Sequence, residues 1–225
     1  MKHLLAVVIM LWSAPVFAEP ASLPKEAEEL AAKLSDVKTY QADFSMETKE
    51  EDGKPVKLEG KISFKTPNQR RLEIKQDDTG GLPQVIVADG KLEWHYDPNT
   101  AQVLRSELPG ELPGPHLPFG EVHPGTLRFV EKSGSGKEAV YRFEGTPATV
   151  LAESSPVPIK VIRLDVSGED GFLRHLVLLD EKGAEVLSQN YNNLRINANI
   201  PASDFIFTPP EGVPVKDLSA PVKSE

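Results

Sequence analysis

The sequence contains no cysteine and no apolar run long enough to cross a membrane. Without cysteine the chain can form no disulfide bond, no thiol nucleophile and no thiolate metal site, and it has no cysteine to carry an N-terminal lipid. The longest apolar run, from Leu4 to Trp12, is shorter than the about 20 residues that a membrane helix needs. We therefore expect a protein that is free in solution.

The sequence also has fewer basic than acidic residues. The chain has 25 lysines and arginines against 34 aspartates and glutamates, which gives a formal net charge of −9. Such an acidic chain repels nucleic acid and anionic membrane surfaces. The charge balance therefore argues against both kinds of partner.

The first eighteen residues follow the pattern of a secretory signal peptide. Lys2 supplies the positive end, the apolar run follows, and Val16-Phe17-Ala18 supplies a small-residue exit. We predict cleavage after Ala18, so that residues 1–18 are the signal peptide. Residues 19–225 would then form a single domain.

Hydrophobic periodicity predicts one helix followed by many strands. Apolar residues recur at helical spacing from Pro24 to Val37, with acidic residues in the first turn. From Tyr40 onward the period changes to two, and turns such as Asp89-Gly90 separate the runs. The expected strands are residues 40–47, 56–65, 70–76, 84–88, 91–96, 101–105, 139–144, 159–166, 172–179, 185–194 and 205–208. The fold class is therefore mainly β, a single antiparallel sheet of about ten or eleven strands.

Residues 106–125 break this pattern with five prolines and four glycines. Proline and glycine disfavour regular structure over most of the stretch. A connection of this length in a compact domain is often a functional lid, which is how we interpret it here.

The sequence offers no evidence for catalysis. Ser133-Gly134-Ser135-Gly136 lacks the first glycine of a nucleophile elbow, and none of the histidines is spaced as in a helical zinc site. The remaining feature is a set of apolar residues at alternating strand positions. These residues form either an ordinary core or a ligand-accessible face, and alternation alone does not distinguish the two. The candidates are Phe44, Met46, Leu58, Ile62, Phe64, Leu72, Ile74, Trp94 and Tyr96.

Several segments together resemble the LolA family of periplasmic outer-membrane lipoprotein carriers. They are the strand Tyr40-Gln41-Ala42-Asp43-Phe44 and the three longer runs 60–67, 87–98 and 204–213. The resemblance implies that the sheet is curled into an unclosed half β-barrel with an N-terminal helix and a lid segment. The nine apolar candidates would line its lipid-binding cavity.

The resemblance also implies a function and partners. The chain would bind the acyl chains of lipoproteins and carry them through the periplasm from the inner to the outer membrane. An inner-membrane lipoprotein-releasing transporter would load it and an outer-membrane acceptor would unload it. We expect a monomer that is not an enzyme and uses no cofactor or metal. The alternative is a periplasmic module on the same fold that senses lipids or lipoproteins and does not deliver them.

Gating residues are assigned from the same resemblance. Thr66 stands where the family commonly has an arginine that holds the lid closed. Arg70 and Arg71 lie nearby in the sequence, and Leu117 and Phe119 lie in the proline-rich lid. We predict that these four residues take part in gating.

Overall fold

The computed structural model describes residues 23–49, 54–76, 81–108, 119, 122–123, 125–148 and 157–218. The predicted signal peptide, Leu117 and most of the proline-rich lid lie outside these residues. The regular elements are α2 (Lys25–Ala32), β1 (Thr39–Lys49), β2 (Pro55–Lys65), β3 (Gln69–Gln76), β4 (Gln84–Asp89), β5 (Leu92–Asp97), β6 (Gln102–Glu107), β7 (Arg128–Ser133), η1 (Gly136–Glu138), β8 (Val140–Gly145), β9 (Ile159–Ser167), β10 (Leu173–Asp180), β11 (Glu185–Ile196), η2 (Ala202–Phe205) and β12 (Val215–Asp217).

Twelve strands follow the order β12-β6-β5-β4-β3-β2-β1-β11-β10-β9-β8-β7 in one sheet. β12 and β7 end this order, so the sheet is unclosed, as predicted. The neighbouring pairs with a defined register are antiparallel, except that β12 runs parallel to β6. Among the described residues, no helix combines the length and apolar character needed to cross a membrane.

Two compact units divide the chain, and each is described by itself. Unit 1 consists of residues 1–37, 45–57 and 116–192, and unit 2 of residues 38–44, 58–115 and 193–225. The prediction of a single domain stays a prediction.

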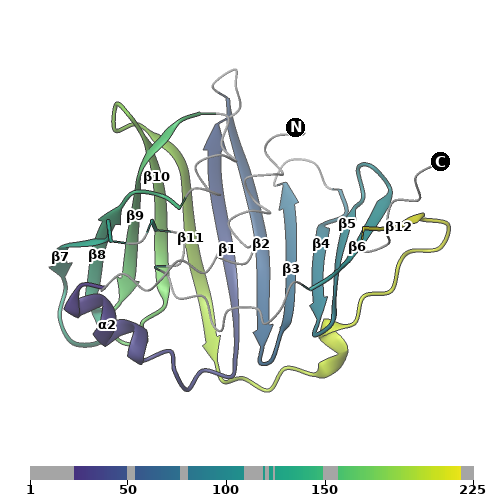
Figure 1. Ribbon diagram of the computed structural model, residues 1–225, viewed down its shortest axis with the longest axis horizontal. Helices are drawn as coiled ribbons and strands as arrows, with labels where there is room; N and C mark the ends of the chain where they lie inside the picture. Colours follow the sequence, from purple (N-terminus) through teal and green to yellow (C-terminus); the bar gives the residue numbers. More distant parts are fainter. Residues whose placement is uncertain are drawn as a thin grey trace. The chain divides into compact units, whose positions relative to one another are not determined.

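Unit 1 contains α2, the strands β7 to β10, and parts of β1, β2 and β11 (Figure 1). The helix is shorter than the expected span 24–37 because α-helical bonding ends at Ala32. Bonds to the third residue back, from Lys33 to Leu30 and from Leu34 to Ala31, then tighten the chain into a turn.

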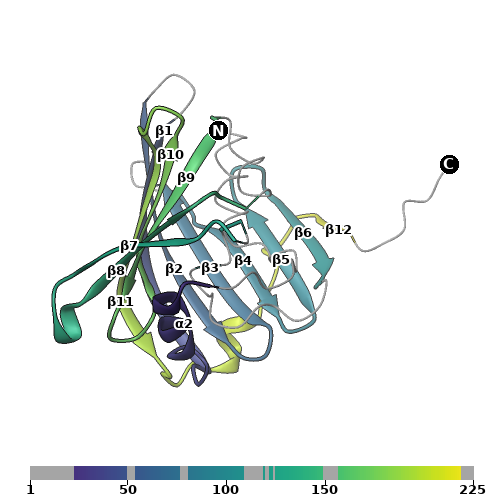
Figure 2. The same ribbon diagram turned by 60° about the vertical axis from the view of Figure 1, so that its left-hand side comes forward.

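The turn between β9 and β10 holds α2 in unit 1 (Figure 2). The Lys33 ammonium donates to the carbonyl of Gly168 at 2.8 Å. Gly171 approaches so closely that a Cβ there would lie 2.4 Å from the carbonyl oxygen of Leu30. Its φ of +78° also favours glycine, so this contact needs a residue without a side chain.

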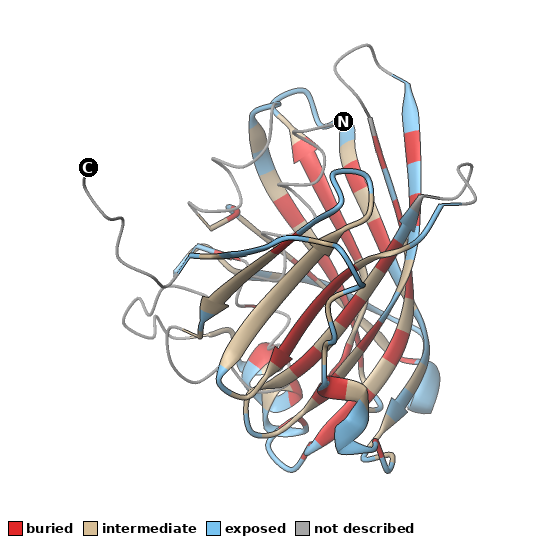
Figure 3. Ribbon diagram, turned by 90° about the vertical axis from the view of Figure 1, so that its right-hand side faces the viewer, coloured by how far each residue is buried: buried red, intermediate tan, exposed pale blue. Residues whose placement is uncertain are grey.

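Unit 2 contains β3 to β6, η2, β12 and the remaining parts of β1, β2 and β11. Buried positions alternate with half-buried or exposed ones along β2 and β3, which is the period of a sheet with two different faces (Figure 3). In β4 the residues from Val85 to Ala88 are all buried, so both faces of this strand are covered.

Three details differ from the expected elements. Residues 205–208 form no strand, because Phe205 ends the 3₁₀ helix η2 and the chain continues without ladder pairing. β7 and β12 were not expected from the sequence. Both are short edge strands with mostly exposed residues, and neither shows a clear apolar alternation.

Candidate functional site

One face of the unit 2 sheet gathers most of the apolar candidates. Directly paired residues of antiparallel strands share a face. Ile62 pairs with Leu72, and Leu72 pairs with Ile86. We call this surface the apolar face of unit 2. It comprises Tyr40, Ala42, Phe44, Leu58, Gly60, Ile62, Phe64, Leu72, Ile74, Ile86 and Ala88.

Aromatic side chains pack tightly on this face. The Tyr40 and Phe64 rings stack with centroids 5.4 Å apart. The Phe44 ring lies over Gly60, where a Cβ would come within 2.4 Å of it. Phe44, Leu58, Ile62, Phe64, Leu72 and Ile74 are all buried. The structure therefore brings these six candidates together, and their binding of a ligand stays a prediction.

The same face becomes charged at its far strands. Phe64 pairs with Arg70, and Ala88 pairs with Glu93. An Arg70 Nη2 to Glu93 Oε2 ion pair of 2.6 Å forms there, and His95 Nε2 lies 2.7 Å from Glu93 Oε1. Arg70, predicted to take part in gating, is thus held by a carboxylate at the edge of the apolar side chains.

Burial and the charge of Arg70 shift the pKa values of Glu93 and Tyr40. Burial raises the pKa of Glu93, but the hydrogen bond with His95 and the charge of Arg70 outweigh it, so the pKa lies below its ordinary value. Burial raises the pKa of Tyr40 well above its ordinary value, and the charge of Arg70 offsets only part of that rise. Tyr40 is therefore a neutral phenol and Glu93 a carboxylate at neutral pH.

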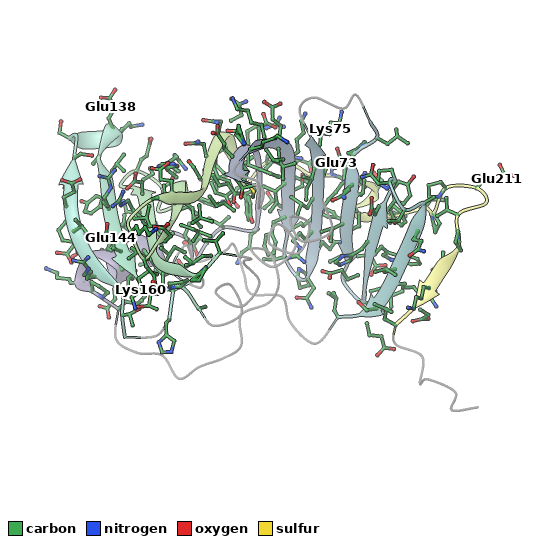
Figure 4. The ribbon with its side chains drawn as sticks, turned by 90° about the horizontal axis from the view of Figure 1, so that it is seen from above. Glu73, Lys75, Glu138, Glu144, Lys160 and Glu211 are labelled. Atoms are coloured by element: carbon green, nitrogen blue, oxygen red, sulfur yellow. The ribbon has the colours of Figure 1, made fainter. Side chains whose placement is uncertain are left out.

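The register places Trp94 and Tyr96 on the opposite face of unit 2. Val87 pairs with Trp94 and with Arg71, and Arg71 pairs with Ser63. The prediction that Trp94 and Tyr96 line one face together with Phe44 and Phe64 is therefore wrong. Their face also carries Glu73 and Lys75, which are labelled in Figure 4.

The C-terminal segment, residues 201–218, covers this second face, which we call the C-terminal face. The Phe207 ring lies 5.9 Å from Trp94 and 6.2 Å from Tyr96. Arg71 Nη1 donates to the carbonyl of Asp204 at 3.3 Å. Arg105 lies over the Trp94 ring and pairs with Asp217. Arg71 is therefore held against this segment and points away from Arg70.

Polar side chains line a groove of about 410 Å³ elsewhere on unit 2. Gln41 donates to Ser63 there, and Asn193 donates to Asp43. Lys61 and Arg195 add positive charge to the lining. Such a lining suits water or polar groups and does not suit an acyl chain.

Unit 1 has an apolar face of its own. Phe143 pairs with Leu164, Leu164 with Leu176, and Leu176 with Gln189. We call this surface the Gln189 face, and it comprises Phe129, Phe143, Ile162, Leu164, Leu176, Leu178, Leu187 and Gln189. Phe119 packs edge-on against Phe143 with centroids 5.1 Å apart, which attaches this predicted lid residue to the Gln189 face. Met46, the remaining apolar candidate, is buried in unit 1.

The opposite face of the unit 1 sheet is an ion-pair ladder. Arg142 binds Asp165 through two hydrogen bonds of 2.8 and 3.0 Å. His175 lies 3.6 Å from Asp165 and 2.9 Å from the Ser188 hydroxyl. Glu144, labelled in Figure 4, pairs with Arg163. The sheet of unit 1 thus separates apolar from charged side chains, with Gln189 as a polar residue on the apolar side.

Sequence reasoning missed Glu93, His95, Phe207 and Gln189. Glu93 and His95 alternate with Trp94 and Tyr96 along β5, so the two pairs lie on opposite faces. The prediction that the aromatic pair lines the cavity therefore assigned Glu93 and His95 to the face away from it. Gln189 lies at a buried position of the period-two pattern in β11, and a polar residue at such a position was the one available signal.

Comparison with known proteins gives matches along nearly the whole chain. The family model described as "Outer membrane lipoprotein carrier protein LolA" matches residues 35–112. An outer-membrane lipoprotein carrier protein of Legionella pneumophila (strain Lens) is 27% identical over 218 residues, covering 96% of this chain and 98% of the relative. The one of Nitrosomonas europaea is 29% identical over 181 residues, covering 79% and 82%. These matches confirm the resemblance predicted from the sequence.

A solved structure supports the fold. The crystal structure of an uncharacterized conserved protein from Thermus thermophilus superposes with a TM-score of 0.59 at 15% identity. The superposition covers 86% of this chain and 99% of that chain. At this identity the likeness concerns the fold alone.

Proposed function

We propose that this chain, which resembles the outer-membrane lipoprotein carriers over nearly its whole length, is a periplasmic carrier of acylated lipoproteins. The observation that carries the proposal is the match to carrier proteins that spans 96% of this chain and 98% of the relative. The chain would bind acyl chains in the periplasm and transport them from the inner to the outer membrane.

The physical need for such a carrier is large. Each methylene moved from an apolar site into water costs about 0.8 kcal/mol, so one long acyl chain costs roughly 10 kcal/mol to expose. The apolar face of unit 2 and the Gln189 face of unit 1 each offer apolar side chains that suit an acyl chain.

We propose that the chain does this without covalent chemistry, cofactor or metal. Binding and release of an acyl chain require no covalent bond to form or break. Within the part of the chain that the structure describes, no group of three or more potential ligands could hold a metal ion.

The proposed partners follow from the proposed route. An inner-membrane lipoprotein-releasing transporter would load the carrier and an outer-membrane acceptor would unload it. The signal peptide, cleaved after Ala18, would bring the chain to the periplasm. We propose that the carrier is a monomer that takes up one acylated client at a time.

Native mass spectrometry with a triacylated peptide tests the proposal. The chain starting at Glu19 should bind the triacylated peptide one to one and should not bind the same peptide without acyl chains. Phe64→Glu places a charge on the apolar face and should weaken binding at least tenfold. Ser63→Glu is the matched control, because Ser63 points to the opposite face. A folded wild-type chain that binds neither peptide would rule out the carrier.

A sensor on the same fold would also bind acylated peptide. It would not need to remove the client from one membrane and return it to another. Transfer of a triacylated peptide between two populations of vesicles, accelerated by the chain, therefore separates a carrier from a sensor.

A further inference from the structure

Gln189 on β11 is a polar side chain at a fully buried position. Its relative exposure is 0%, and it is among the largest fully buried side chains of the described residues. Neither its Nε2 nor its Oε1 atom forms a hydrogen bond with any residue that the structure describes. A primary amide has two donor hydrogens and an acceptor oxygen, and among the described residues none of them has a partner.

The neighbours of Gln189 toward β10 are apolar. Leu176 lies directly opposite on β10, and Leu187 precedes it by two residues on the same face. Leu164 and Phe143 continue that face on the next two strands. The polar residues Ser188 and His175 lie on the other face of the sheet, where they form a hydrogen bond with each other.

Such an arrangement is unfavourable in the folded protein. A buried amide without partners loses its bonds to water and gains none in return. A leucine of similar volume would fill the same place at no such cost. An unsatisfied buried group in a native structure therefore calls for an explanation, and a partner that arrives later is one.

We propose that the Gln189 amide is the polar anchor for the carbonyl linkage of an acylated ligand on the Gln189 face. This inference rests on the proposed carrier function and names the group that recognises the ligand. The Nε2 hydrogens donate to an ester or amide carbonyl oxygen of the linkage, and Oε1 accepts from the N–H of an N-acyl amide. The alkyl tails contact the surrounding side chains Phe143, Leu164, Leu176 and Leu187. A hydrogen bond in this apolar setting is stronger than one exposed to water.

Access to Gln189 requires side chains that cover the face to move. Phe119 covers the Phe143 end of this face, since it is buried and packs edge-on against that ring. A ligand that replaces Phe119 on the Gln189 face exchanges one apolar contact for another and gains the hydrogen bonds of the amide.

Isothermal titration calorimetry with matched probes tests whether Gln189 anchors the carbonyl linkage. The probes are a triacylated peptide, an ether-linked trialkyl analogue without acyl carbonyls, and a short-chain diacyl phospholipid. Gln189→Leu should lower affinity for the triacylated peptide about tenfold, which is the value of one hydrogen bond. Its affinity for the ether analogue should equal that of wild type. Asn190→Leu is the matched control, because Asn190 is exposed and alternates with Gln189, and it should bind all probes like wild type.

Each outcome decides a different point. Equal binding of the triacylated peptide by Gln189→Leu and wild type overturns the anchor and leaves the carrier function standing. Failure of wild type to bind any acylated probe overturns the carrier function itself, and the anchor with it. A loss seen with the phospholipid but not with the triacylated peptide overturns the assignment to an acylated protein.

A second measurement needs no variant and holds even if Gln189→Leu fails to fold. The side-chain amide of Gln189 in ¹⁵N-labelled wild type should shift downfield on addition of the triacylated peptide and not on addition of the ether analogue. An amide signal that responds equally to both probes contradicts the anchor.

Discussion

At the scale of single residues, the apolar face of unit 2 depends on a glycine that lets aromatic rings approach the sheet. A Cβ at Gly60 would lie 2.2 Å from the carbonyl oxygen of Glu73 and 2.4 Å from the Phe44 ring. The first of these atoms belongs to the backbone of a paired strand and cannot move cheaply. The close packing of Phe44 therefore requires glycine at this position.

Gly60→Ala should lower the free energy of unfolding by about 1–3 kcal/mol, because overpacking forces side chains and backbone apart. Urea unfolding followed by circular dichroism measures the loss. Lys61→Ala, at an exposed position one residue along, should change the unfolding free energy little. Equal stability of Gly60→Ala and wild type would show that Phe44 does not pack over Gly60.

The ion pair of Arg70 and Glu93 makes stability depend on pH. Because the folded pKa of Glu93 is lowered, its stabilising contribution is present above the unfolded pKa and is lost as pH falls through the folded value. The unfolded pKa of a glutamate is about 4.3, so this loss falls in the acid range below about pH 4.

Glu93→Gln should lower the free energy of unfolding at neutral pH by about 1–3 kcal/mol, because Arg70 loses a charged partner. The variant should also lose less stability than wild type between about pH 5 and pH 3. Glu59→Gln, at an exposed position of β2, serves as the control and should follow the wild-type curve. Parallel pH curves for Glu93→Gln and wild type would contradict the role of this ion pair.

At the scale of elements, the C-terminal segment closes the C-terminal face of unit 2. Phe205 is fully buried, Phe207 contacts Trp94 and Tyr96, and Asp217 on β12 pairs with Arg105 of β6. The aromatic residues of β5 are thus already occupied by a segment of the same chain. Ligand binding on the apolar face should leave the contacts of Trp94 and Tyr96 with Phe207 unchanged.

Phe207→Ala should shift the emission of Trp94 to longer wavelength, because it removes a ring at 5.9 Å and admits water. In a chain that starts at Glu19, Trp94 is the only tryptophan. The unfolding free energy should fall by about 0.5–3 kcal/mol, while affinity for triacylated peptide should be retained. Ile206→Ala, at an exposed neighbouring position, should leave the emission unchanged. Loss of peptide binding in Phe207→Ala would place the lipid site on the C-terminal face instead.

Apolar alternation within one strand predicted where the strands lie. It did not predict which residues of neighbouring strands share a face. Ile62, Phe64 and Leu72 share a face as predicted, because a short turn joins β2 to β3. Between β3 and β4 the connection is longer, and β4 is apolar at every position from Val85 to Ala88. A strand with two buried faces has no period-two signal. The sequence therefore could not show that Ile86 shares a face with Leu72, while Val87 shares the opposite face with Trp94.

At the scale of the whole molecule, three strands run through both compact units. β1, β2 and β11 each contribute residues to unit 1 and to unit 2. The mainly β sheet was predictable from periodicity and turns, since both are local signals. Its unclosed form was expected from the family resemblance and not from periodicity. The parallel pairing of β12 with β6 was not, because it joins residues more than a hundred positions apart.

Export can be checked on the whole molecule as well. The mature protein should begin at Glu19 and should appear in the periplasmic fraction without detergent, because the small-residue exit at Ala18 precedes it. Intact-mass measurement identifies the first residue. A mass that includes residues 1–18, or recovery from membranes alone, would refute cleavage after Ala18.

The most direct test of a carrier is whether it removes an acylated client from a membrane into water. Vesicles containing a fluorescent triacylated peptide are mixed with the chain starting at Glu19 and then sedimented. A carrier should move the fluorescence to the supernatant in proportion to added protein, and Phe64→Glu should move much less of it than Ser63→Glu. Fluorescence that stays with the vesicles at every concentration of folded protein would contradict the carrier function.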